Sequence, residues 1–278
     1  MPCEICSLGL NDCLRSEFMK MISILHLGAI DYATGLRLQQ RLVELRKEGR
    51  IGDVVLLLEH TPVITLGRNA KAGNILASPQ VLAQRGVEVS ECDRGGDVTF
   101  HGPGQMVAYP IFDLRGFTAH DGKRMTLGVI EYVHRLEEVL IRTCADYRIV
   151  TKRISGLTGV WTEQSPEAKI AALGVHISRA VTSHGVALNV NTDLNYFNLI
   201  IPCGIESKPV TSMEKELGKK VALQEVANSI SRHFGQVFEC QVLWLESLDD
   251  LLGSGVGVPM KAPENLRRLH SEDDTAWA

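Results

Sequence analysis

No stretch of the sequence is both long and apolar enough to cross a membrane, for which a helix needs roughly 20 residues. Residues 1–20, MPCEICSLGLNDCLRSEFMK, lack the basic start followed by an apolar core that marks a secretory signal. The formal net charge is −4, so the chain as a whole has no attraction for nucleic acid. These absences favour a cytoplasmic protein without a membrane or nucleic-acid partner.

The seven cysteines show no regular spacing that would indicate a disulfide framework. An odd, scattered set is typical of a reducing compartment. Cys3 and Cys6 form a C-x-x-C pair, yet no second pair and no nearby pair of histidines could complete a zinc site. We therefore predict no metal. We interpret residues 1–20 as a flexible leader or a misassigned start, since Met19 and Met21 immediately precede the first expected strand.

The pattern of apolar residues predicts one mixed domain. Alternating or continuous apolar segments predict strands at residues 21–28, 53–60, 62–67, 87–93, 106–114, 147–151, 158–162, 169–177 and 185–191. Helical spacing predicts helices at residues 32–47, 79–85, 125–147, 212–217 and 223–238. Strands that follow one another without intervening helices favour an α+β fold, a single mixed-sheet domain over residues 21–240. We expect residues 241–278 to form a loose C-terminal tail.

Several of these helices have recognisable ends. Asp31 is a typical N-cap, and Ser78 followed by proline is another. Thr211 and Glu214 predict a capping box for the short helix that Gly218 ends.

A glycine-rich segment, RGGDVTFHGPGQ, covers residues 94–105 and has four glycines in twelve residues. Glycines let backbone amides face a ligand without a side-chain wall. No Gly-Lys-Ser/Thr follows, as a P-loop requires, and a strand follows where a dinucleotide-binding fold needs a helix. We therefore expect a loop beside an elongated or acyl ligand, the alternative being a hairpin loop shaped by turn chemistry alone.

Two polar residues begin apolar strands. Lys169 opens EAKIAALGVHI, where a lysine is usually an edge residue with its ammonium in water. His184 opens SHGVALNVN, where a histidine is usually a capping or core-edge residue. Taken singly, neither residue identifies a site.

One cysteine occupies an unusual position. Cys203 lies in NLIIPCGIESKPV, between a proline that fixes φ and a glycine that permits unusual dihedrals. Such a thiol is presented at a turn, although an apolar residue at the edge of the core is the simpler interpretation.

Together these segments resemble a known family. RGGDVTFHGPGQMVAYP, KIAALGVHI, HGVALNV and IIPCGI resemble, in this order, the signature blocks of lipoyl(octanoyl) transferases. LEHTPVITLGR and VTSMEKE agree as well, so the resemblance spans residues 25–238. It implies the fold of the catalytic domain of biotin- and lipoate-protein ligases.

The resemblance also implies an activity. The family transfers an octanoyl group from acyl carrier protein to a lysine of a lipoyl domain, through a thioester on the enzyme and without a cofactor. Its acceptors are the lipoyl domains of 2-oxoacid dehydrogenase E2 subunits and the glycine cleavage H protein. The acyl-carrying cysteine matches Cys203 and its partner lysine matches Lys169. Gln105 and His184 are candidate supporting residues. The substrate-lining segments match Arg94, Gly95, Gly96, Asp97, Val98, Thr99, Phe100 and His101, then Ala172, Leu173 and Gly174, then Gly185, Val186 and Ala187.

Elementary chemistry agrees with this assignment. Only about 3% of an ordinary thiol is thiolate at pH 7, and a neighbouring ammonium increases that fraction. Lys169 could supply the charge when the thiolate attacks, and could accept a proton from the incoming amine. Gly204 and nearby backbone amides are candidate oxyanion donors. Exchange between thioesters is nearly isoenergetic and amide formation is downhill, so no ATP is required.

Three alternatives remain open at this point: an ATP-dependent lipoate- or biotin-protein ligase on the same fold, a non-catalytic module that holds an acylated protein, and a cysteine hydrolase. A ligase activates a free acid as an adenylate and has no use for a nucleophilic cysteine. A hydrolase would pass the acyl group to water instead of an amine.

The acyl donor constrains the surface of the protein. Acyl carrier proteins are strongly acidic, whereas this chain has a net charge of −4. The docking face should therefore be locally basic. Candidate residues, chosen by proximity in sequence, are Arg148, Lys152, Arg153, Lys208 and Lys215.

Overall fold

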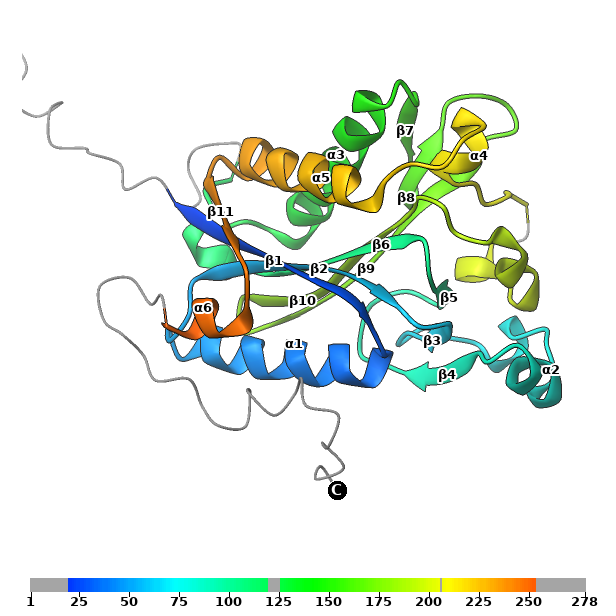
Figure 1. Ribbon diagram of the computed structural model, residues 1–278, viewed down its shortest axis with the longest axis horizontal. Helices are drawn as coiled ribbons and strands as arrows, with labels where there is room; N and C mark the ends of the chain where they lie inside the picture. Colours follow the sequence, from blue (N-terminus) through cyan, green and yellow to red (C-terminus); the bar gives the residue numbers. More distant parts are fainter. Residues whose placement is uncertain (1–19, 120–125, 206, 254–278) are drawn as a thin grey trace, which may run out of the picture.

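The computed structural model describes residues 20–119, 126–205 and 207–253 (Figure 1). Within them an eight-stranded sheet has the order β11-β1-β2-β6-β10-β9-β8-β7. Its strands are β1 (Met21–Ile30), β2 (Asp53–His60), β6 (Gln105–Ile111), β7 (Thr151–Ile154), β8 (Leu157–Thr162), β9 (Lys169–Ser178), β10 (Val181–Asn189) and β11 (Gln241–Leu245). β1 pairs in parallel with β11 and β2, whereas the other neighbours are antiparallel. The predicted mixed sheet is confirmed.

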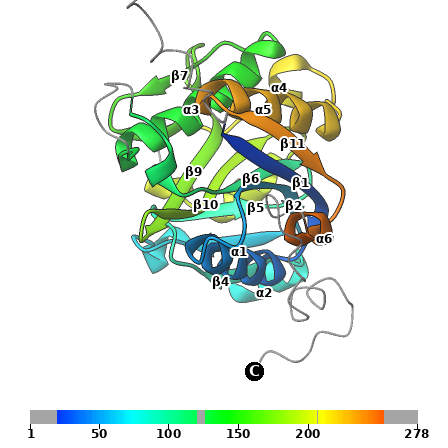
Figure 2. The same cartoon turned by 90° about the vertical axis from the view of Figure 1, so that its left-hand side faces the viewer.

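Helices cover both faces of this sheet. α3 (Val129–Asp146) and α5 (Leu223–Phe238) lie above it in Figure 1, and α1 (Tyr32–Lys47) lies below it, as the turned view in Figure 2 also shows. One core cluster joins α3 and α5 to the sheet, and a second joins α1 and α6 (Leu248–Gly253) to the opposite face. Because both faces are covered, β2 is a nearly continuous run of buried apolar residues, as its sequence indicates.

A smaller sheet lies at one end of the molecule. It has the order β4-β3-β5, from β3 (Val63–Leu66), β4 (Glu88–Glu91) and β5 (Val98–His101). α2 (Pro79–Gln84) connects two of these strands, and a third apolar cluster fills the space behind them. The remaining helix, α4 (Met213–Leu217), precedes α5.

The structure corrects two of the predicted helix starts. α3 begins at Val129, later than expected, and Ile130 is 75% exposed although its spacing suggested the buried face. The expected start, Met125, lies outside the described residues. The cap of α4 is Ser212, whose hydroxyl accepts from the Lys215 amide, so the predicted Thr211–Glu214 capping box is wrong. Thr211 precedes this cap by one residue, and its own amide donates to the Lys169 carbonyl.

One predicted strand and part of the predicted tail are also wrong. The segment 147–151 is mostly not a strand, since Arg148 turns the chain with φ 62° and β7 starts only at Thr151. Part of the expected tail is structured: β11 pairs with β1, and α6 buries Leu248 and Leu251 against the α1 side of the sheet. Residues 1–19 of the expected leader and residues 254–278 lie outside the described residues, whereas Lys20 lies within them.

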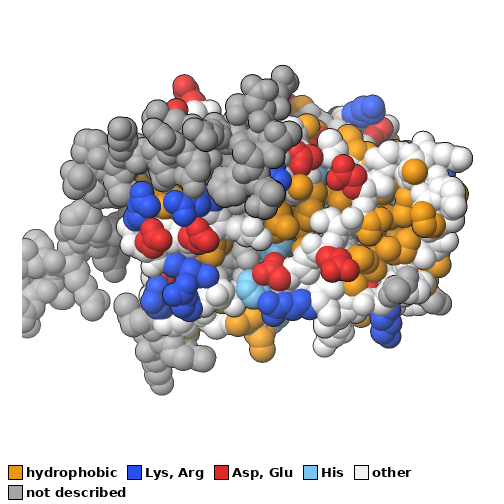
Figure 3. Space-filling view, turned by 90° about the horizontal axis from the view of Figure 1, so that it is seen from below, with side chains coloured by type: hydrophobic (Ala, Val, Ile, Leu, Met, Phe, Trp, Pro, Cys, Tyr) orange, Lys and Arg blue, Asp and Glu red, His pale blue; other side chains and the backbone are white. Residues whose placement is uncertain are grey.

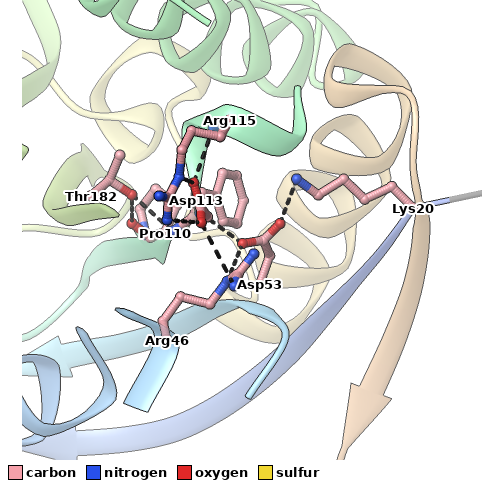
Figure 4. A network of polar contacts seen from close by, with 8 residues as sticks. Lys20, Arg46, Asp53, Pro110, Asp113, Arg115 and Thr182 are labelled. Carbon is pink, nitrogen blue, oxygen red and sulfur yellow. Dashed lines mark hydrogen bonds and ion pairs between the residues drawn. The ribbon is translucent and has the colours of Figure 1, made fainter. Parts of the chain in front are cut away.

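The buried carboxylate of Asp53, the first residue of β2, connects several segments of the fold (Figure 4). Asp53 is 2% exposed and binds Lys20 at 2.6 Å and Arg46 at 2.7 Å. It also accepts a hydrogen bond of 2.8 Å from the Asp113 amide. Two cations and an amide offset the cost of burying this charge. The network fixes the start of β1, the end of α1 and the end of β6. Gln105 lies at the other end of β6.

Candidate active site

Cys203 lies in a tight turn with a left-handed backbone. Residues Pro202–Gly204 form one 3₁₀ turn in which Cys203 has φ 56° and ψ 19°. A non-glycine residue in this region is strained and persists only where the surroundings enforce it. Gly204 has φ 68°, and a Cβ there would lie 2.9 Å from the Asp97 carboxylate. Proline on one side and glycine on the other therefore hold the thiol outward, as the sequence predicts.

The Lys169 ammonium reaches this thiol from the first residue of β9. Its Nζ donates to Cys203 Sγ at 3.2 Å, although the two residues are 34 positions apart. The Lys169 amide donates to the Pro209 carbonyl and its carbonyl accepts from the Thr211 amide, so the backbone is fixed on both sides. The predicted convergence of strand and turn is confirmed.

The surroundings of Lys169 direct its charge toward sulfur. The residue is 7% exposed, and among the residues that the structure describes no carboxylate forms an ion pair with it. Its Nζ lies 5.1 Å from the centroid of the Trp161 ring. A Cβ at Gly159 would lie 2.5 Å from Lys169 Cε, so glycine leaves the room that the side chain occupies. Trp161 and Gly159 were not predicted, because a Gly-x-Trp strand looks like ordinary core. The Lys169 ammonium therefore has the Cys203 sulfur as its hydrogen-bond partner.

The expected glycine-rich loop contains a strand. Residues Val98–His101 form β5, which pairs with β3, so side chains alternate between the two faces. Thr99 and His101 face the cavity beside Cys203, whereas Phe100 stacks on Tyr196 in the third apolar cluster. Val98 belongs to that cluster too. The substrate-lining roles assigned to Val98 and Phe100 are therefore corrected: both support the wall from behind.

Two charged residues of the glycine-rich segment, Arg94 and Asp97, connect it to neighbouring parts of the chain. Arg94 is 7% exposed, and its Nη2 donates to the carbonyl and the hydroxyl of Thr65, both at 2.8 Å. Asp97 accepts from the Lys71 amide at 3.2 Å and from Asn74 Nδ2 at 2.6 Å. These contacts tie the segment to β3 and to the chain that follows it.

A partly enclosed cavity, lined by residues from several elements, begins at Cys203. Of the residues predicted to line it, the structure places there Arg94, Gly96, Asp97, Thr99, His101, Ala172, Leu173, Gly174, Gly185, Val186 and Ala187. His184 lines it as well, whereas Gly95 and Gln105 do not. Tyr32 and Tyr109 also line it and were missed, because one aromatic residue in a helix and one in a buried strand look like core.

The wall formed by the rings is uncharged at neutral pH. Burial lowers the pKa of His101 to about 3 and raises that of Tyr109. Gln105 Oε1 lies 2.7 Å from His101 Nδ1, and Gln105 Nε2 donates to Asn189. Gln105 does not line the cavity itself but contacts His101, which does. A neutral wall suits an apolar chain.

His184 is held in a second left-handed position, with φ 55°. Its amide donates to Gln39 Oε1 at 2.7 Å, and its Nε2 lies 2.7 Å from Asp93 Oδ1. Burial lowers the pKa of His184, although Asp93 opposes this effect. The residue is therefore part of the cavity wall and not a simple strand cap.

One expected role is not supported. The Gly204 amide donates to the Ile201 carbonyl at 3.1 Å within the turn, so it is not free to bind an oxyanion.

Across the three described ranges, no cluster of three or more His, Cys, Asp or Glu side chains could hold a metal ion. In the same ranges, no helix has the length and apolar character needed to cross a membrane.

The sequence matches a family model described as the lipoyl protein ligase A/B catalytic domain, over residues 31–235. The chain belongs to this family. An octanoyltransferase of Koribacter versatilis is 64% identical over 253 residues, which cover 91% of this chain and 98% of the relative. An octanoyltransferase of Acidobacterium capsulatum is 59% identical, over 84% of this chain and 96% of the relative. The resemblance stated from the sequence is confirmed.

Solved structures agree on the fold. A putative lipoate protein ligase of Thermoplasma acidophilum with bound lipoic acid superimposes with a TM-score of 0.63 at 12% identity, covering 83% of this chain and 91% of that one. A lipoate-protein ligase A bound with ATP gives a TM-score of 0.62 at 12% identity, covering 84% and 92%. The predicted ligase-like catalytic domain is thus confirmed as a fold.

Proposed function

We propose that this protein is an octanoyltransferase that modifies proteins during lipoylation, through a thioester on Cys203. It is an acyltransferase enzyme, in keeping with relatives up to 64% identical that are named octanoyltransferases. The observation that carries the thioester mechanism is the 3.2 Å contact between Lys169 Nζ and Cys203 Sγ at the mouth of a cavity that has a neutral wall of rings.

The first half-reaction forms the acyl-enzyme. The Cys203 thiolate attacks the carbonyl of an octanoyl thioester on acyl carrier protein. The tetrahedral intermediate collapses, the carbon–sulfur bond to the donor breaks, and the carrier leaves as a thiolate that takes up a proton. Lys169 stabilises the attacking sulfur by its charge. The octanoyl chain then lies in the cavity between β5 and the β9–β10 pair.

The second half-reaction forms an amide. The amine of a lysine on a lipoyl domain attacks the Cys203 thioester, Cys203 leaves as a thiolate, and the amine loses a proton. We propose that Lys169, after giving up its own proton to solvent, accepts this one. The acceptors are lipoyl domains of 2-oxoacid dehydrogenase E2 subunits and the glycine cleavage H protein. We expect the reaction to occur in the cytoplasm and to need no cofactor.

The fold alone does not decide between transfer and ligation, because a lipoate-protein ligase A of the same fold binds ATP. The thiol supports transfer. An adenylate-forming ligase needs no cysteine at the carboxyl end of the acyl chain, whereas here a buried ammonium contacts one. The non-catalytic alternative leaves this contact without a purpose.

We expect octanoylation of a lipoyl domain from octanoyl-acyl carrier protein without ATP, because the donor thioester already carries the activated acyl group. The measurement is the mass of the acceptor after incubation with enzyme and either donor thioester or free octanoate plus ATP. Only the thioester should support the reaction. ATP-dependent use of free octanoate would assign the protein to the ligase class, and release of octanoate without acceptor modification would make it a hydrolase.

A further inference from the structure

A second hollow, open to solvent, adjoins the turn that carries Cys203. Its lining includes Ile201, Pro202 and Ile205, which flank Cys203 in the sequence. Leu76, from the segment before α2, also lines it and is 59% exposed. Figure 3 shows hydrophobic side chains gathered on the right, at the end of the molecule that carries α2 and β4 in Figure 1. An exposed apolar groove beside the turn that carries the thiol is typical of a surface for a protein partner.

One rim of the groove is positively charged. Lys208 lines the groove, and both it and Lys152 bind the Glu167 carboxylate, the latter at 2.7 Å. One carboxylate between two ammonium groups leaves a local excess of positive charge. Of the five basic residues that the sequence suggested, these two lie here. Arg153 is instead engaged by Glu137 and Glu138 on α3.

A third basic residue has its backbone held close to the turn. Lys71 is exposed, and its side chain forms no ion pair within the described ranges. Its amide and the Asn74 side chain both donate to Asp97, whose carboxylate lies beside Gly204. The Asn74 carbonyl accepts from the Ile201 amide at 2.8 Å. Lys71 is thereby anchored next to the Cys203 turn by a rigid set of contacts.

We propose that this groove, with Lys71, Lys152 and Lys208 around it, is the docking surface for the acidic carrier protein that delivers the acyl group. The inference rests on the proposed function, which requires a thioester to reach Cys203 from outside. A chain of net charge −4 repels an acidic partner over most of its surface, so a local positive rim beside the thiol selects where that partner binds. The apolar floor then supplies the buried contact.

The test compares two donors that carry the same thioester, octanoyl-acyl carrier protein and octanoyl-pantetheine. The measured quantity is the single-turnover rate of enzyme acylation, followed by mass spectrometry. For Lys71→Gln combined with Lys208→Gln, we expect about a fivefold to tenfold loss of efficiency with the carrier protein, because rim charges set the association rate. The rate with octanoyl-pantetheine should be unchanged. Added salt should slow the wild type with the carrier and affect the variant less.

A matched control is Arg50→Gln, since Arg50 pairs with exposed Glu48 before β2, far from the Cys203 turn along the sheet. It should behave as wild type with both donors. Equal losses with both donors, no loss with either, or a loss confined to transfer from the acyl-enzyme to the lipoyl domain would each overturn the docking surface. If neither donor acylates the wild type, the proposed function fails and the docking surface fails with it.

Discussion

Replacement of Cys203 by alanine is expected to lower octanoyl transfer by roughly 10³-fold or more, because it removes the only group proposed to carry the acyl chain. Cys203→Ser should fail as well, since a hydroxyl is scarcely ionised at neutral pH and the turn geometry alone cannot activate it. The measurement is the rate at which a lipoyl domain gains an octanoyl group from octanoyl-acyl carrier protein.

The other described cysteines serve as controls. Burial raises the pKa of Cys144 and of Cys240 to about 12, so their thiols are unreactive at neutral pH. Cys92 donates to the Leu66 carbonyl and does not line the cavity. Replacement of each by serine or alanine should leave the transfer rate within about twofold, after correction for folded protein. A loss at Cys92 as large as that at Cys203 would show that the wrong thiol has been assigned.

Lys169→Ala is expected to slow iodoacetamide labelling of Cys203 at pH 7 about tenfold or more, because the ammonium 3.2 Å from sulfur no longer favours the thiolate. Transfer should fall at least as much. Lys169→Arg keeps a positive charge but not a compact donor with a removable proton. Arginine should therefore partly restore labelling, yet fail in transfer from the acyl-enzyme to the amine.

Two readings separate the charge from the proton transfer: the pH dependence of labelling, and the single-turnover rate of transfer to the lipoyl domain, each in wild type and both variants. Full activity of Lys169→Arg in the second half-reaction would remove the base role and leave only charge stabilisation. Unchanged labelling and unchanged transfer in Lys169→Ala would make Lys169 an ordinary buried lysine.

Local patterns predicted most of the framework. Asp31 caps α1 as expected, accepting from the Thr34 amide, and α5 covers the predicted residues 223–238. The errors arose where tertiary contacts outweigh local signals. Residues 98–101 look like part of a glycine-rich loop, yet β3 offers hydrogen-bond partners and makes them a strand. Likewise, β1 recruits the segment after residue 240 as an edge strand.

The candidate site was predictable in its chemistry but not in its walls. Lys169 and Cys203 stand out through motif resemblance, and their contact follows from where β9 begins. Tyr32 and Tyr109 line the cavity from α1 and β6, elements whose other residues build cores, so their sequence pattern predicts burial and nothing more. The same reasoning explains why Phe100 was assigned to the substrate: spacing does not reveal which face of β5 meets the cavity.

The most direct test of the central claim is the intact mass of the enzyme after mixing with octanoyl-acyl carrier protein, followed by peptide mapping. We predict a gain of one octanoyl group, located on Cys203, that disappears when a lipoyl domain is added and reappears as an amide on that domain. An octanoyl group on any other residue, or an acceptor that becomes octanoylated while Cys203 is never modified, would contradict the account.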